Sequence, residues 1–156
     1  MYGKRLKSPR LTSWHGDSGR VYNYSGTSYS PAPWTAELLK IREKATELAN
    51  VEFNSVLLNL YRDGSDGVSW HADDEAELAT NPTIASVSFG AVRDFHLRHN
   101  QYKELGIPSK KYALPAGSVL IMKGETQSNW KHQVPKRSIN KHADARVNLT
   151  FRFIHS

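Results

Sequence analysis

Short segments with the composition of β-strands follow one another along most of this chain after residue 50. They are separated by Gly, Pro, Asn and Asp, and the alternation of strands with helices that a parallel sheet requires is missing. We therefore expect an antiparallel sandwich or barrel. The expected strands are 53–61, 83–89, 92–98, 117–123, 129–134 and 146–154.

One helix is expected before these strands. Apolar side chains recur at helical spacing from Pro33 onward, and Asn50 is suited to end the helix. The chain has 156 residues, enough to bury one sizeable core. We expect residues 1–156 to form a single, mainly β domain with one or two helices. The helical set is Trp34, Leu38, Ile41, Ala45 and Leu48.

Two of the expected strands carry a polar face. In "NSVLLNLYRDG", Leu57, Asn59 and Tyr61 point to the same side, because successive side chains of a strand alternate between faces. Such a face is usually solvent-exposed, but its apolar neighbours indicate the lining of an interior. If this interior also holds the two arginines of the second strand, they would need negatively charged partners, which a dicarboxylate ligand would supply. In "RVNLTFRF" the polar face carries Arg146, Asn148, Thr150 and Arg152.

The stretch "VSWHADDEAEL" contains His71 and Asp73, which project to the same side of an extended segment. A third ligand, His132 in "NWKHQVP", would complete a facial triad of two histidines and one carboxylate. Such a triad binds Fe(II) and leaves positions open for other ligands, whereas a tetrahedral zinc site is closed. An H-x-D motif alone is weak, because spaced histidines and acids arise by chance on many surfaces.

The charge of the chain favours a polyanionic partner. The net charge is +6, and basic and aromatic residues alternate in the first 33 residues, where we expect loops and short strands. The chain contains no cysteine, which excludes disulfides and thiolate metal sites and fits a reducing compartment. We see no signal peptide and no apolar run that would span a membrane.

These motifs together resemble the AlkB family of Fe(II)- and 2-oxoglutarate-dependent dioxygenases. The resemblance runs from about residue 9 to 153 and implies a double-stranded β-helix, or jelly-roll, core. It also implies oxidative demethylation of N-alkylated bases such as 1-methyladenine and 3-methylcytosine in DNA, and it leaves RNA open as a second substrate. The matching stretches are "PRLTSWHGD", "FNSVLLNLYRDGSDGVSWHADDE", "PTIASVSFGAVRDFHLRH", "LPAGSVLIM" and "WKHQVPK…ARVNLTFR".

The resemblance assigns cofactors and roles. Fe(II) would be bound by His71, Asp73 and His132, and 2-oxoglutarate and O2 would occupy the remaining positions. Succinate, CO2 and formaldehyde would be released. Among the residues of the 2-oxoglutarate pocket, Arg146 and Tyr61 would hold the distal carboxylate, Arg152 and Asn59 would lie nearer the metal end, and Asn148 and Thr150 would complete the walls.

The resemblance also suggests how substrate is held. Residues 1–30 would be a partial nucleotide-recognition arm, since family members usually have more chain before this point. Tyr24 would stack on the damaged base and Tyr22 would steady the adjoining phosphate. We expect Glu75 to favour cationic alkylated bases, and Arg10 to form an ion pair with Asp74 that pins the arm over the site.

Two other functions remain open from the residues. A 2-oxoglutarate oxygenase acting on a protein or small molecule would keep the triad but should not need the basic, aromatic arm. A non-catalytic nucleic-acid-binding module would not need an intact triad with both arginines. The expected partner is nucleic acid rather than a membrane, and we expect a monomer in the cytoplasm, or in the nucleus of a eukaryote.

Overall fold

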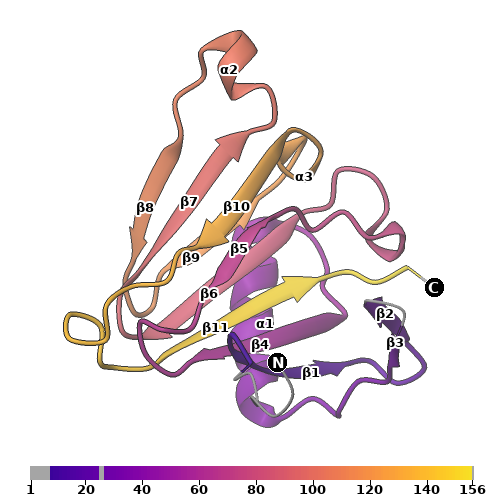
Figure 1. The fold of residues 1–156 in the computed structure, drawn as a ribbon. Helices are drawn as coiled ribbons and strands as arrows, with labels where there is room; N and C mark the ends of the chain where they lie inside the picture. The colour runs from indigo at the N-terminus through magenta and orange to yellow at the C-terminus, as the bar shows by residue number, and fades with distance from the viewer. Residues whose placement is uncertain (1–7, 25–26, 156) are drawn as a thin grey trace, which may run out of the picture.

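Two antiparallel sheets face each other in the computed structural model, which describes residues 8–24 and 27–155 (Figure 1). The larger sheet has the strand order β1 (Leu11–Gly16), β4 (Ser55–Tyr61), β11 (Arg146–Arg152), β6 (Ile84–Gly90) and β9 (Val119–Met122). The smaller sheet has the order β5 (Val68–His71), β10 (Trp130–Val134), β7 (Arg93–His99) and β8 (Lys110–Leu114). A hairpin joins β2 (Tyr22–Tyr24) to β3 (Thr27–Tyr29). The expected antiparallel sandwich is confirmed.

The long helix α1 (Ala36–Ala49) lies against the outer face of the larger sheet (Figure 1). It begins where the Thr35 hydroxyl accepts a hydrogen bond from the backbone N–H of Leu38. It ends at Asn50, which adopts the left-handed conformation with φ 56°. Both the helix and its expected end are confirmed.

The alternation of β11 and β4 divides their side chains between two layers. Leu149 and Phe151 pack under α1 together with Val56, in one apolar cluster. A second cluster, which includes Ile84, Phe95 and other apolar residues, lies between the two sheets. The polar side chains of β11 therefore point into the interior between the sheets, as the alternating pattern predicted.

Several elements were not predicted from the sequence. Strand β8 is an edge strand with the charged sequence KKYAL, and four of its five side chains are exposed, so it carries no apolar alternation. The hairpin of β7 and β8 extends away from the sandwich, with the one-turn helix α2 (Tyr102–Leu105) at its tip (Figure 1). Two further helical turns are η1 (Ala76–Leu78) and α3 (Thr126–Asn129). Among the described residues, no helix is long and apolar enough to cross a membrane.

Candidate metal centre and adjoining pocket

Three side chains that lie far apart in the sequence meet at one end of the interior. His71 on β5 and His132 on β10 are direct cross-strand partners, and Asp73 follows β5 by two residues. One ligand atom from each of the three lies within 4.8 Å of the others. The Nε2 atom of His71 is 3.7 Å from Oδ1 of Asp73. The structure thus brings together the three predicted metal ligands, and their ligand atoms lie close enough to bind one metal ion.

A hydrogen bond orients one histidine of the cluster, and burial keeps the other neutral. Nδ1 of His71 lies 2.7 Å from the carbonyl oxygen of Ser69, which only accepts hydrogen bonds, so Nδ1 donates there and Nε2 is the nitrogen that faces Asp73. His132 is buried under the ring of Phe95. Burial lowers the pKa of His132 to about 4, despite the opposing charge of Asp73. Neutral imidazole is the form that binds metals.

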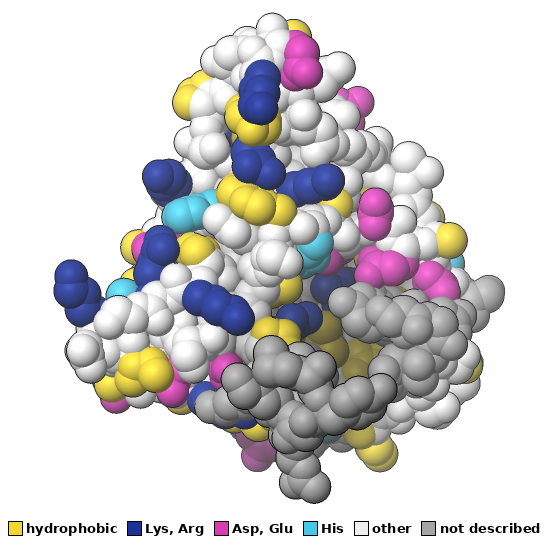
Figure 2. Space-filling model, in the orientation of Figure 1, with side chains coloured by type: hydrophobic (Ala, Val, Ile, Leu, Met, Phe, Trp, Pro, Cys, Tyr) yellow, Lys and Arg dark blue, Asp and Glu magenta, His cyan; other side chains and the backbone are white. Residues whose placement is uncertain are grey.

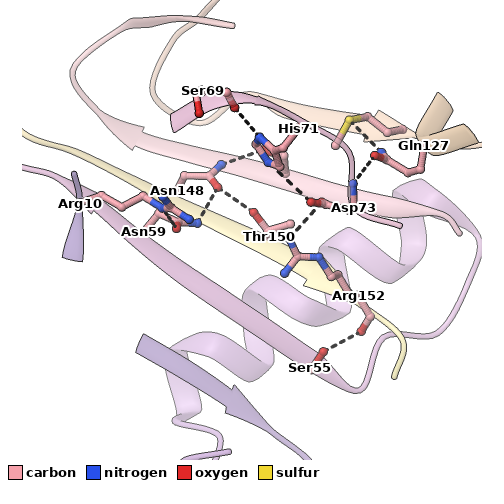
Figure 3. Close-up of polar contacts among 12 residues, drawn as sticks. Arg10, Ser55, Asn59, Ser69, His71, Asp73, Gln127, Asn148, Thr150 and Arg152 are labelled. Atoms are coloured by element: carbon pink, nitrogen blue, oxygen red, sulfur yellow. Dashed lines mark hydrogen bonds and ion pairs between the residues drawn. The ribbon is translucent and has the colours of Figure 1, made fainter. Parts of the chain in front are cut away.

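Asp73 is buried and ionised. Burial alone would raise the pKa of its carboxyl group, but the Arg152 guanidinium and the two histidines outweigh burial and lower it. Nη2 of Arg152 donates to Oδ2 of Asp73 at 3.0 Å, while Oδ1 faces His71 (Figure 3). The carboxylate therefore keeps one oxygen directed at the histidines.

A cavity between the two sheets adjoins this cluster. The cross-strand pairs Arg146 with Tyr61 and Asn148 with Asn59 place the polar faces of β11 and β4 side by side. The prediction that these two faces line one interior is confirmed. The polar lining consists of Arg10, Asn59, Tyr61, His71, Asp73, Ser86, His132, Arg146, Asn148, Thr150 and Arg152.

A hydrogen-bonded row fixes the wall of the cavity. Thr150 Oγ1 donates to Asn148 Oδ1 at 2.8 Å, and Asn148 Nδ2 donates to Ser86 Oγ at 2.6 Å. Asn59 joins the row through a longer contact of 3.5 Å to Asn148 (Figure 3). Ser86 comes from β6, whose apolar sequence gave no indication of a polar role.

Arg146 marks the other end of the cavity. Its side chain is only 2% exposed, and among the described residues no carboxylate pairs with it. Nη2 donates to Ser88 Oγ at 2.9 Å, but Nε and Nη1 have no acceptor. The guanidinium lies 5.3 Å from the ring of Tyr61. Burial raises the pKa of the Tyr61 hydroxyl, although nearby arginines oppose this shift, so the hydroxyl stays protonated. A buried cation with free donors fits an anionic ligand group.

The expected ion pair between Arg10 and Asp74 is wrong. Nε of Arg10 donates to Oδ1 of Asn59 at 2.8 Å instead, and Asp74 is exposed. Pairing of β1 with β4 sets Leu11 opposite Leu60. The side chain of Arg10, the preceding residue, therefore reaches across β4 to the mouth of the cavity. The sequence could not show which strand would lie beside the arm.

The residues expected to bind substrate are only partly described. Arg10, Asp74 and Glu75 line an open cleft of about 460 Å³ that includes His71 and Asp73. The backbones of Tyr22 and Tyr24 form β2, but their side chains lie outside what the structure describes. Three of the five candidate substrate-binding residues therefore line the same cleft as His71 and Asp73.

Besides Ser86, sequence reasoning missed three further buried polar residues around the site. Ser88 holds Arg146, and Gln127 Oε1 accepts a hydrogen bond from the backbone N–H of Asp73. Arg93 donates to the backbone carbonyls of Asp63, Asp66 and Pro135, and so ties together two loops beside the cavity. Each of the three acts through a neighbour or a backbone group, which leaves no spacing signal in the sequence.

The sequence profile of the 2OG-Fe(II) oxygenase superfamily matches residues 2–152. The chain belongs to this superfamily. The description of the superfamily names Fe(II), 2-oxoglutarate and an oxygenase reaction, which confirms the cofactors expected from the sequence. The AlkB resemblance is confirmed as well, since the curated relatives at 40–43% identity bear AlkB-family names.

Three relatives show the extent of the similarity. Human "DNA oxidative demethylase ALKBH2" is 43% identical over 99% of this chain and 60% of its own length. Rat "Alpha-ketoglutarate-dependent dioxygenase alkB homolog 3" is 41% identical over 94% of this chain and 50% of its own. The Arabidopsis thaliana ALKBH2 is 40% identical over 99% and 56%. The chain thus spans between half and two thirds of the length of these relatives.

A solved structure shares the fold. The structure of OsALKBH1 superimposes with a TM-score of 0.66, and the match covers 97% of this chain and 83% of the other. The two sequences are 19% identical, so this likeness concerns the fold alone. It confirms the mainly β, jelly-roll architecture.

Proposed function

We propose that this protein removes methyl groups from N-alkylated nucleobases of nucleic acid, as an Fe(II)- and 2-oxoglutarate-dependent oxygenase. One observation carries the proposal: the unpaired, buried Arg146 and the cluster of His71, Asp73 and His132 lie on the same cavity. A ligand with an anion at one end and metal-binding oxygens at the other fits between them. The names of the relatives supply the substrate class, since ALKBH2 is a DNA oxidative demethylase.

The three clustered residues would hold the metal. Two histidines and one carboxylate would leave Fe(II) with a net positive charge and with open positions. Bound Fe(II), with 2-oxoglutarate and O2, supplies the oxidising power that hydroxylates an N-methyl carbon, after which formaldehyde is lost and succinate and CO2 remain. Arg152 keeps the Asp73 carboxylate ionised for this role.

The wall residues would hold the cosubstrate. Arg146 would pair with the distal carboxylate through its free Nε and Nη1, and the protonated Tyr61 hydroxyl would donate to the same group. The fixed amides of Asn148 and Asn59, with Thr150, would set the width of the pocket. Arg152 would lie at the metal end, where it already meets Asp73.

The outer cleft would receive the base. Glu75 is half-buried at its edge and would attract bases that carry a positive charge, as 1-methyladenine and 3-methylcytosine do. The target edge is hidden in normal pairing, so the base must be flipped out or captured from a single strand. We assign residues 1–30 to a recognition arm, in which Tyr24 would stack on the base and Tyr22 would contact the next phosphate.

A basic and aromatic surface on the smaller sheet favours nucleic acid over a protein or small-molecule substrate. Arg98 lies 4.3 Å from the ring of Trp70 and 4.9 Å from that of Tyr102, and Lys103 lies 5.8 Å from Tyr102. Figure 2 shows basic side chains interspersed with hydrophobic ones over the half of the molecule that holds β7 and β8. Trp70 packs against His96 and Arg98, so this surface is the outer face of the sheet whose inner face carries His132. Cations bind phosphates and rings stack on bases.

A single assay tests the proposal. The protein is incubated with Fe(II), 2-oxoglutarate, ascorbate and a panel of methylated oligonucleotides, and methyl loss is followed by mass spectrometry. We expect loss from 1-methyladenine and 3-methylcytosine, and none with His132→Ala. Succinate release that no oligonucleotide stimulates would instead support an oxygenase acting on a protein or small molecule.

The proposed enzyme would act as a monomer, because every group assigned to the pocket comes from one chain. Activity per chain should then be independent of protein concentration, and sedimentation should give one copy. A nucleic-acid substrate would place it in the cytoplasm or, in a eukaryote, the nucleus.

A further inference from the structure

Gln127 contacts the main chain of the central carboxylate ligand. Its side chain is 3% exposed, and its Oε1 atom accepts a hydrogen bond from the backbone N–H of Asp73 at 2.9 Å (Figure 3). Its Nε2 atom lies 3.5 Å from the sulfur of Met122. The orientation of the amide follows from these partners, since the N–H of Asp73 requires an acceptor.

Asp73 needs such a contact more than the two histidines do. His71 and His132 are held by pairing between β5 and β10, whereas Asp73 lies beyond the end of β5. Its backbone N–H is buried and would be unsatisfied without Gln127. Arg152 meanwhile attracts one carboxylate oxygen, so the direction of the other oxygen depends on where the main chain lies.

The helical turn that carries Gln127 is itself well anchored. Ser128 Oγ donates to Asn81 Oδ1 at 3.0 Å, and the backbone N–H of Asn100 donates to the carbonyl of Asn129 at 2.8 Å. The same segment continues directly into β10 and His132. The α3 turn thus connects the strand of one ligand to the loop of another.

We propose that Gln127 is a positioning residue that holds Asp73 in its ligand position before any metal binds. The inference rests on the proposed metal site. Without an acceptor at residue 127, the segment after β5 must shift to find another partner for its N–H. Metal affinity should then fall. Arg146 and Tyr61 lie at the far end of the cavity, so they should still bind 2-oxoglutarate.

Three variants separate positioning from general loosening. Gln127→Met keeps the length of the side chain but removes the acceptor, and Gln127→Glu keeps an acceptor oxygen. Ser128→Ala is the matched control, because it removes the tie to Asn81 on the same turn and leaves Gln127 intact. Each purified, metal-free protein is titrated with Co²⁺, a redox-stable probe, and then with 2-oxoglutarate at saturating Co²⁺.

We expect Gln127→Met to weaken Co²⁺ binding about 10- to 100-fold, the usual loss when a residue supporting a metal ligand is removed. Gln127→Glu and Ser128→Ala should bind Co²⁺ like the parent, and 2-oxoglutarate affinity at saturating Co²⁺ should be unchanged in all three. If Gln127→Met does not fold, Gln127→Asn replaces it, since an amide one methylene shorter cannot reach the same N–H.

The outcomes distinguish the two proposals. A parent protein that binds no Co²⁺ would overturn the metal site itself. A parent that binds Co²⁺ while Gln127→Met binds it equally well would overturn only the positioning role. Equal losses in Gln127→Met, Gln127→Glu and Ser128→Ala would also overturn it, because they would mean that α3 merely loosens.

Discussion

At the scale of single residues, Arg146 is a buried cation that pairs with no carboxylate among the described residues. A guanidinium without a carboxylate partner is costly to bury, and the structure offers it one serine hydroxyl and the ring of Tyr61. Such an arrangement is stable in a protein when a ligand supplies the missing charge. The sequence predicted this need from alternation alone, because Arg146 and Arg152 fall on the face of β11 opposite its apolar residues.

Replacing Arg146 with Met should therefore weaken 2-oxoglutarate binding by roughly 2–4 kcal/mol, the range for truncating one partner of a buried charge pair. Calorimetric titration of the Co²⁺-loaded protein measures this loss. Lys136→Ala, which removes an exposed cation, is the control and should leave the affinity unchanged. Similar losses in the two variants would show that the distal carboxylate binds elsewhere.

His132 should make the metal-free protein sensitive to acid. Its pKa is about 4 in the folded protein but 6.5 in the unfolded chain, so between these values only the unfolded state takes up the proton. Stability should fall as the pH drops from about 7 to 4, by at most about 3 kcal/mol at roughly 1.4 kcal/mol per pKa unit. Asp73 contributes in the same direction only at lower pH, because its pKa is depressed below 3.8.

Urea unfolding of the metal-free protein at pH 7 and pH 5 measures this dependence. The variant His132→Asn, which cannot titrate in this range, should lose less stability between the two pH values than the parent. A parent whose stability is the same at both values would show that the ring of His132 is protonated in the folded state.

At the scale of elements, prediction succeeded where a segment carries its own periodicity. The helix α1 and the six predicted strands all appear; α1 begins three residues after Pro33, and the ends of the strands differ by up to two residues. Strand β8 was missed because an edge strand needs no apolar face, and the one-turn helices α2 and α3 are too short for a 3.6-residue pattern to show. Their formation depends on contacts with distant parts of the chain.

The ends of α1 should contribute measurably to stability. Thr35→Ala removes the hydroxyl that accepts from Leu38 N and should cost about 1 kcal/mol. Asn50→Gly is the matched change at the other end, and because glycine adopts the left-handed conformation without strain it should cost nothing. Thermal unfolding should show a Tm lowered by about 2–4 °C for the first variant alone. Equal melting temperatures for both would mean that packing on the sheet, and not capping, holds the helix.

At the scale of the whole molecule, the pairing of strands makes the site. The polar wall was predictable, because each residue's face follows from its own strand, and the triad was predictable because His71 and Asp73 share one side of an extended segment and His132 lies on a strand. The Arg10 contact with Asn59 and the Gln127 contact with Asp73 were not, since they depend on which segments become neighbours after folding. The incorrect pairing of Arg10 with Asp74 shows this limit: opposite charges near one site do not reveal which strand lies between them.

The arrangement of the two sheets also sets where the basic and aromatic surface of the smaller sheet lies, and this gives the last prediction. Arg98 lies between Trp70 and Tyr102 on the smaller sheet, whereas Lys40 is exposed on α1, behind the larger sheet. If nucleic acid crosses the smaller sheet, Arg98→Ala should raise KM for a methylated oligonucleotide and lower the slope of log affinity against log salt by about 1. Lys40→Ala should change neither value.

Succinate formation without oligonucleotide should be unaffected in both variants, because neither residue lines the cavity. KM values measured at several salt concentrations decide the question, and an unchanged salt slope in Arg98→Ala would mean that the strand approaches from another side.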